Sequence, residues 1–68
     1  MDAPRFSKIE LTGTLTTRYL RSIILLDDGT HWRAVGLPWG AWKYMGERVR
    51  AEGMVVGRNK VDVVMLEG

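Results

Sequence analysis

The sequence predicts a small all-β barrel of five strands, with one short helix between the third and fourth strands. Several stretches alternate apolar and polar side chains with a period of two, which is typical of half-buried strands. Two of these stretches carry a glycine at the same place in the pattern, and a glycine inside a strand marks a bend. A central stretch contains a proline and a final glycine where a helix would begin and end.

The 68-residue chain is long enough for one domain, and a domain of this size buries only about 60% of its unfolded surface. It contains no cysteine, so disulfides cannot stabilise it. Stability must therefore come from a compact core or from a partner subunit. We expect a flexible N-terminal arm over residues 1–7, with Phe6 contacting the barrel, and a single domain over residues 8–68.

The first expected strand covers residues 8–17. Its apolar face comprises Ile9, Leu11, Gly13 and Leu15, and threonines occupy much of the other face. The strand expected over residues 48–56 repeats this pattern, with Gly53 in the place of Gly13. Two bent strands with matching glycines predict a pair that coils together.

The other strands are bounded by turns. A loop or a bulged strand start over residues 17–21 precedes a strand at 22–26. An Asp-Gly turn at 27–30 then leads into a strand at 31–35. The last turn, residues 57–60, contains glycine and asparagine, which tolerate a positive φ. Val61, Val63 and Met65 form the expected inner face of the final strand.

A short helix of about two turns is expected between the third and fourth strands. Pro38 suits a first helical position, and Gly46 suits a helix end. Gly40 weakens this helix, so packing must hold it. We expect Trp39 and Trp42 to plug the lower end of the barrel, with stacking on a ligand as the alternative.

This order of elements is that of an OB-fold, a five-stranded Greek-key barrel with a helix between strands three and four. SH3-like barrels also have five strands, but their helical turn lies between the last two strands. Residues 57–60 leave no room for such a turn. We therefore predict an OB-like Greek-key barrel.

Five short motifs, GTL, LLDDGTHWR, LP, GERVRAEG and KVDVV, follow one another along the chain. In the spacing of these motifs, residues 13–66 resemble a family of short bacterial OB-like proteins that is classed as a domain of unknown function. The motifs are turns, glycines and core positions. The resemblance therefore implies the fold and a bacterial source, and it carries no activity and no functional residue.

Nucleic-acid binding is the first functional interpretation. OB barrels bind through strands two and three and through the loops that join strands one to two and four to five. Both loops are basic here, and cations that hold phosphates beside rings that stack on bases are what single-strand binding requires. The candidate residues are Arg18, Tyr19, Arg21, His31, Arg33, Arg58 and Lys60. The expected ligand is single-stranded DNA or RNA, bound with weak sequence specificity.

Structural roles are the alternative for several of these residues and their neighbours. Arg58 and Lys60 would then only keep a turn solvated, and Trp32, which alternates with Ala34, would face the core. The arginines at 48 and 50 are expected to pair with acidic neighbours such as Asp62.

Protein interaction or homo-oligomerisation, with no role in nucleic-acid binding, is the second functional interpretation. Apolar residues fall on the otherwise polar faces of the last two strands, and an exposed apolar patch marks an interface. The candidate interface residues are Met54, Val56, Val64 and Leu66. They predict a homodimer or docking to a larger protein, unless the helix and the N-terminal arm cover them.

Catalysis is not expected. The aspartates at 27 and 28 read as turn formers, and His31 is the only histidine, with no partner at a metal or catalytic spacing. We therefore predict a non-enzyme without a cofactor or a metal site. The longest apolar runs have four residues, too few to span a membrane, and the start does not read as a signal peptide. We expect a cytoplasmic protein.

Overall fold

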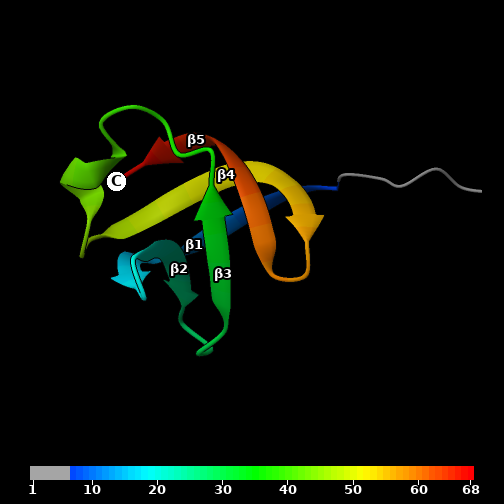
Figure 1. The fold of residues 1–68 in the computed structure, drawn as a ribbon, viewed down its shortest axis with the longest axis horizontal. Helices are drawn as coiled ribbons and strands as arrows, with labels where there is room; N and C mark the ends of the chain where they lie inside the picture. Colours follow the sequence, from blue (N-terminus) through cyan, green and yellow to red (C-terminus); the bar gives the residue numbers. More distant parts are fainter. Residues whose placement is uncertain (1–6) are drawn as a thin grey trace, which may run out of the picture.

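The structure, a computed structural model, describes residues 7–68, which form five strands and one short helix (Figure 1). The elements in chain order are β1 (Lys8–Arg18), β2 (Arg21–Leu26), β3 (His31–Val35), η1 (Ala41–Tyr44), β4 (Arg48–Gly57) and β5 (Lys60–Glu67). Of the expected arm, only Ser7 is described, and its carbonyl accepts a hydrogen bond from the Val55 N–H at 2.8 Å. The predictions for residues 1–6, including Phe6, lie outside the described residues.

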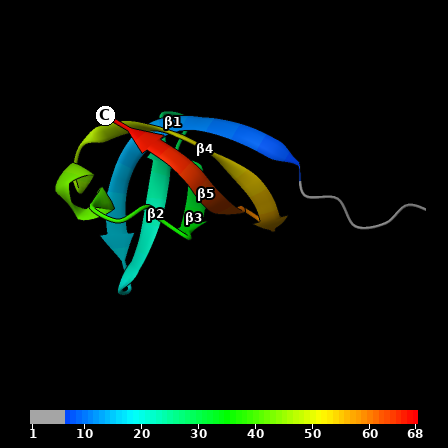
Figure 2. The same ribbon diagram turned by 90° about the horizontal axis from the view of Figure 1, so that it is seen from above.

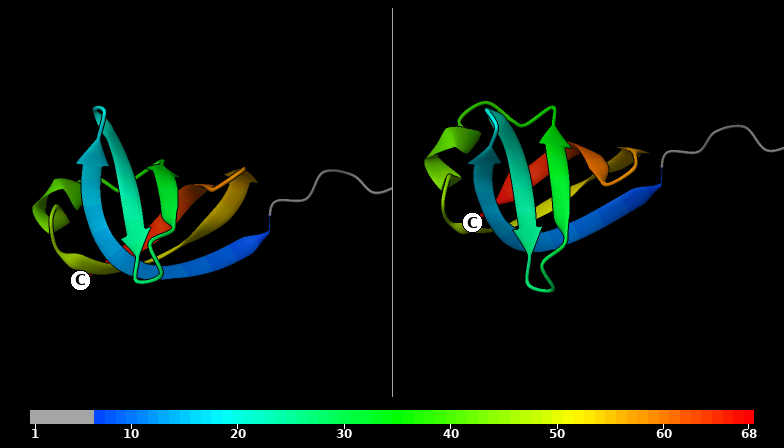
Figure 3. Two further views of the ribbon diagram at one scale, coloured as in Figure 1. Left: turned by 90° about the horizontal axis from the view of Figure 1, so that it is seen from below. Right: turned by 60° about the horizontal axis from the view of Figure 1, so that its bottom comes forward.

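The five strands form one sheet that closes into a barrel in the order β1-β2-β3-β5-β4, so the all-β, five-stranded prediction is confirmed. Neighbouring strands are antiparallel, except for β3 and β5, which are parallel. β1 pairs with β4 along Lys8–Thr14 and with β2 along Gly13–Arg18. Because β1 pairs with both strands, it curves strongly, as Figures 2 and 3 show.

The core lies inside the barrel and is built from the alternate, inward-facing residues of every strand. Within residues 7–68 no polar or charged residue is buried. Trp32 is partly buried against this core, as its alternation with Ala34 predicts. The buried core residues of the strands are Leu11, Leu15, Ile24, Ala34, Val49, Ala51, Val61 and Val63.

The two strand glycines lie where backbones approach closely. β1 and β4 pair as predicted, and Gly13 pairs with residues of both β2 and β4. A Cβ at Gly13 would lie 2.3 Å from the Leu25 carbonyl oxygen, and one at Gly53 would lie 2.2 Å from the Asp62 carbonyl oxygen. Only glycine allows these strands to bend so closely around the core.

A bulge in β5 reverses the expected facing of its last residues. Gly53 pairs with Val63 and Glu52 pairs with Met65, so Val64 is an extra residue without a partner on β4. One inserted residue moves every later side chain to the other face. Leu66 therefore packs against the core, and Met65 is exposed, contrary to the predicted inner position of Met65.

The connection between β3 and β4 also differs from the prediction. The expected two-turn helix is a single 3-10 turn, because Gly40 takes a left-handed conformation with a φ of 88°. In a 3-10 turn, residues three apart share one face, so Ala41 and Tyr44 both turn toward the barrel. The predicted plug is wrong, because Trp39 and Trp42 are 99% and 74% exposed.

The turns follow the predicted chemistry. The Asp28 carboxylate accepts a hydrogen bond from the Thr30 N–H at 2.9 Å, and Gly29 takes a φ of 89°. Asn59 takes a φ of 49° in the last turn. Within residues 7–68, the single four-residue helix is far too short to cross a membrane.

Candidate nucleic-acid interface

β3 is the centre of the predicted site. Its inward residues are Trp32 and Ala34, so His31 and Arg33 project from the outer surface of the barrel. Arg33 is level with Ile23 of β2 on one side and with Lys60 of β5 on the other. The parallel pairing of β3 with β5 thus brings the start of β5 beside the outer residues of β3.

The β1–β2 turn is attached to β3 through Arg18. The Arg18 Nη1 lies 3.0 Å from the Nε2 of His31, and the Arg18 guanidinium lies over the Tyr19 ring, 5.9 Å from its centre. Tyr19 is 86% exposed at the turn. Arg21 is paired with Arg18 across the turn, so two arginines precede and follow the Tyr19–Leu20 pair.

His31 holds the Arg18 side chain beside the turn. A guanidinium group can only donate hydrogen bonds, so Arg18 is the donor and the His31 Nε2 is the acceptor. Residues 7–68 contain no group of three His, Cys, Asp or Glu side chains that could hold a metal ion.

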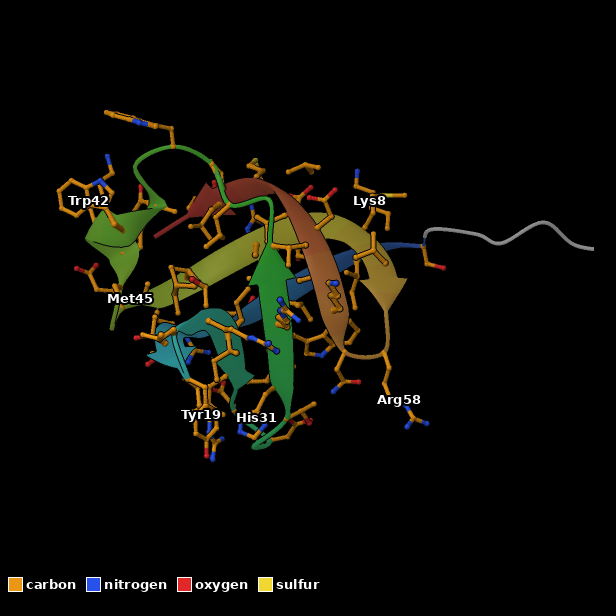
Figure 4. The ribbon with its side chains drawn as sticks, in the orientation of Figure 1. Lys8, Tyr19, His31, Trp42, Met45 and Arg58 are labelled. Carbon is orange, nitrogen blue, oxygen red and sulfur yellow. The ribbon has the colours of Figure 1, made fainter. Side chains whose placement is uncertain are left out.

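The β4–β5 turn is attached to the other edge of β3 through Asn59. The Asn59 side-chain amide donates to the His31 carbonyl at 3.0 Å, and the Asn59 carbonyl accepts from the Arg33 N–H at 2.8 Å. The adjacent Arg58 is exposed and points away from the barrel (Figure 4). Asn59 is not among the predicted site residues, although its position between two cations in a turn could have marked it.

All seven predicted residues thus lie on three segments that contact one another. We call this surface the basic face, defined by Arg18, Tyr19, Arg21, His31, Arg33, Arg58 and Lys60. The outer side chains of β2, Ile23 and Leu25, lie level with Arg33 and His31 and add apolar surface to it. Tyr19 supplies its aromatic ring, since Trp32 packs on the core.

Ion pairs occupy a different part of the surface. Arg50 pairs with Glu10 and Glu67, and Lys8 lies 4.0 Å from Glu52. Arg48 binds Asp27 through two hydrogen bonds of 2.8 and 2.9 Å. Arginines 48 and 50 therefore have acidic partners, as expected, but the partner is not Asp62.

The Asp62 carboxylate instead covers Gly36, at the end of β3. Within residues 7–68, no carboxylate oxygen lies within 4.0 Å of a side-chain nitrogen of any cation of the basic face. These cations are Arg18, Arg21, Arg33, Arg58 and Lys60. Two surface hollows, one beside Lys8 and Glu52 and one beside Arg48 and Arg50, lie among the ion pairs and contain no residue of the basic face.

The predicted interface patch is only partly present. Val64 is 65% exposed at the β5 bulge, and Val56 is exposed at a second irregularity in β4. Met54 is half-buried and level with Asp62. Leu66 is wrongly placed in the patch, because the bulge turns it onto the core, and Met65 is exposed in its stead.

Comparisons with known proteins identify no relative: no protein-family model matches the chain, and no match was found among curated proteins or solved structures.

Proposed function

We propose that this protein is an OB-like module that binds single-stranded nucleic acid through the basic face, with weak sequence specificity and without catalysis. One observation carries the proposal. Five cations, none of them neutralised by a described carboxylate, lie on three segments that hydrogen bonds hold around β3. Clustered cations without acidic partners attract a polyanion.

The strand order supports the OB-like assignment. The order β1-β2-β3-β5-β4 with parallel β3 and β5 lets the β1–β2 and β4–β5 turns flank the outer surface of β2 and β3. In OB-folds, this surface and these two loops bind oligonucleotides. The basic face coincides with that region of the barrel.

The residue types indicate what is recognised. Arginine and lysine contact phosphates, which fix the position of a strand but carry no sequence information. Tyr19 offers a ring for stacking, and every base has a face that can stack. Such a surface is expected to tolerate many sequences and to depend strongly on salt.

Salt dependence tests the proposal. Binding of a labelled oligothymidine and of an oligouridine would be titrated at several salt concentrations, for the wild type and for two double variants, Arg18→Gln/Arg21→Gln and Arg58→Gln/Lys60→Gln. The slope of log K against log salt changes by roughly 0.7 for each phosphate contact on a single strand. Each double variant should therefore flatten the slope by roughly 1.4.

A matched control removes two charges away from the basic face. Lys8→Gln/Lys43→Gln changes the net charge by the same amount, and both lysines are exposed outside the basic face. It should leave the slope close to that of the wild type. Absence of binding by the wild type at low salt, or an equal effect of all three double variants, would contradict the proposal.

A second candidate function is self-association through the β4–β5 surface. The observation that favours it is Val64, which the bulge leaves 65% exposed on the same strand as the exposed Met65. Exposed apolar side chains that gather on a small protein indicate a contact with another chain. This surface is distinct from the basic face, so the two functions are compatible.

A further inference from the structure

The β1–β2 turn presents two apolar side chains in a conformation that disfavours them. Tyr19 and Leu20 form a two-residue turn between Arg18 and Arg21, with φ values of 53° and 65°. Turns with both central residues at positive φ strongly prefer Asn-Gly, because a side chain crowds the backbone in the left-handed region. Tyr-Leu at this place therefore reduces the stability of the hairpin.

Packing does not compensate for this cost. Tyr19 is 86% exposed and Leu20 is 101% exposed, so neither side chain contributes to the core. Residues held in sparsely populated backbone conformations cluster at ligand-binding sites. The turn thus holds an exposed ring and an exposed aliphatic side chain without benefit to the barrel itself.

The charges around the turn indicate the ligand. The Arg18 guanidinium lies over the Tyr19 ring and is held by His31, and Arg21 lies across the turn. A nucleotide offers a flat base for the ring and a phosphate for a guanidinium next to it. Trp39 and Trp42 are also exposed, but the cation beside them, Lys43, lies over the Tyr44 ring instead.

We infer that the Tyr19–Leu20 turn is a preformed stacking element that contacts an unpaired base, while Arg18 and Arg21 contact the adjacent phosphates. This inference rests on the proposed function and names the element that selects single strands, since a duplex buries the faces of its bases.

The test compares two labelled oligomers of equal length, an oligothymidine and the same backbone with every base replaced by an abasic site. Base stacking on an aromatic side chain lets the wild type bind the oligothymidine roughly 5- to 150-fold more tightly than the abasic oligomer. The variant Tyr19→Asn/Leu20→Gly should bind both oligomers with the same affinity. It should keep the salt slope of the wild type, and its urea midpoint should rise because Asn-Gly suits the turn.

Two further variants make the test specific. Tyr19→Phe keeps the ring and should keep the preference for bases, whereas Tyr19→Ser should lose it. Tyr19→Ser also carries the test if the double variant does not fold.

The outcomes separate this inference from the proposed function. A variant that keeps the full preference for oligothymidine would overturn the stacking role and leave salt-dependent binding by the basic face intact. Failure of the wild type to bind either oligomer would overturn both. Tighter binding to vesicles of anionic phosphatidylserine than to oligothymidine, lost in the same variant, would also overturn the inference and assign the turn to a lipid surface.

Discussion

Gly13 and Gly53 are the two residues at which the lack of a side chain decides how closely neighbouring strands approach. Both lie against a backbone carbonyl, which cannot move aside as a flexible side chain could. The repeated pattern of the two strands was sufficient to predict both positions. A glycine inside a strand is unfavourable unless the geometry requires it, and this is why the pattern is informative.

Gly13→Ala should destabilise the protein by roughly 1–3 kcal/mol, because the new methyl group would force β1 away from β2. The free energy of unfolding in urea measures this loss. Gly57→Ala is the matched control, since a Cβ there would make an ordinary contact of 3.5 Å with the Lys60 Cβ. An equal loss in both variants would show that the approach at Gly13 does not limit the fold.

The tryptophans of the β3–β4 connection could not be placed from the sequence. Pro38 and Gly46 mark the ends of a helix equally well whether it has one turn or two. The left-handed Gly40 delays the helix to Ala41, and this shift decides which side chains face the barrel. Tyr44, rather than Trp39 or Trp42, therefore packs against the core of the barrel.

At the level of strands, the sequence predicted the first and last residues of β3 correctly. It did not predict which side chains at the end of β5 face the core. β3 alternates clearly between a polar outer side and an apolar inner side. The end of β5, residues 63–66, is a continuous apolar run, so nothing in it reveals that Val64 is an inserted residue. Only the pairing with β4 shows the bulge.

The β2–β3 turn is joined to the start of β4 by the pair of Asp27 and Arg48. The Arg48 guanidinium lowers the pKa of Asp27 below the ordinary value of 3.8. A lowered pKa in the folded state means that the pair adds stability above the ordinary pKa and that this stability is lost as the pH falls through the lowered value. The turn should therefore weaken in acid.

Asp27→Asn should lower the urea midpoint at neutral pH, and the difference from the wild type should vanish as the pH falls below 3.8 and through the lowered pKa of Asp27. Urea unfolding curves at a series of pH values measure this difference. In an Arg48→Gln background, the same substitution should have no pH-dependent effect. A difference that stays constant from neutral to acidic pH would show that the ion pair is not its cause.

At the level of the whole molecule, the net charge of +2 conceals a segregation of charge. Among residues 7–68, the ion pairs lie on β1, β4, β5 and the β2–β3 turn, whereas the five cations of the basic face, which have no described carboxylate within 4.0 Å, lie around β3. The basic composition of the two turns could be read from the sequence. The attachment of both turns to β3 could not be predicted from the sequence. It depends on the parallel pairing of β3 with β5 and on the hydrogen bonds made by Arg18 and Asn59.

Self-association through the β4–β5 surface would change the mass of the particle in solution. If this surface joins two copies, sedimentation at low micromolar concentration should show a dimer. The variant Val64→Glu should sediment as a monomer, and its circular dichroism spectrum should show that it is folded. Thr12→Glu is the control, since Thr12 is also exposed on the outside of the barrel, on β1. A wild type that sediments only as a monomer would rule this function out.

The parallel contact of β3 with β5 is short, with only residues 33–35 level with residues 60–62. If β3 and β5 separate, the other four strand pairings still join the strands as one antiparallel sheet, in the order β3-β2-β1-β4-β5. That opened sheet has two free edges, and a free strand edge is a template for pairing with another chain. The contact that assembles the basic face is thus also the place where strand exchange and aggregation would begin.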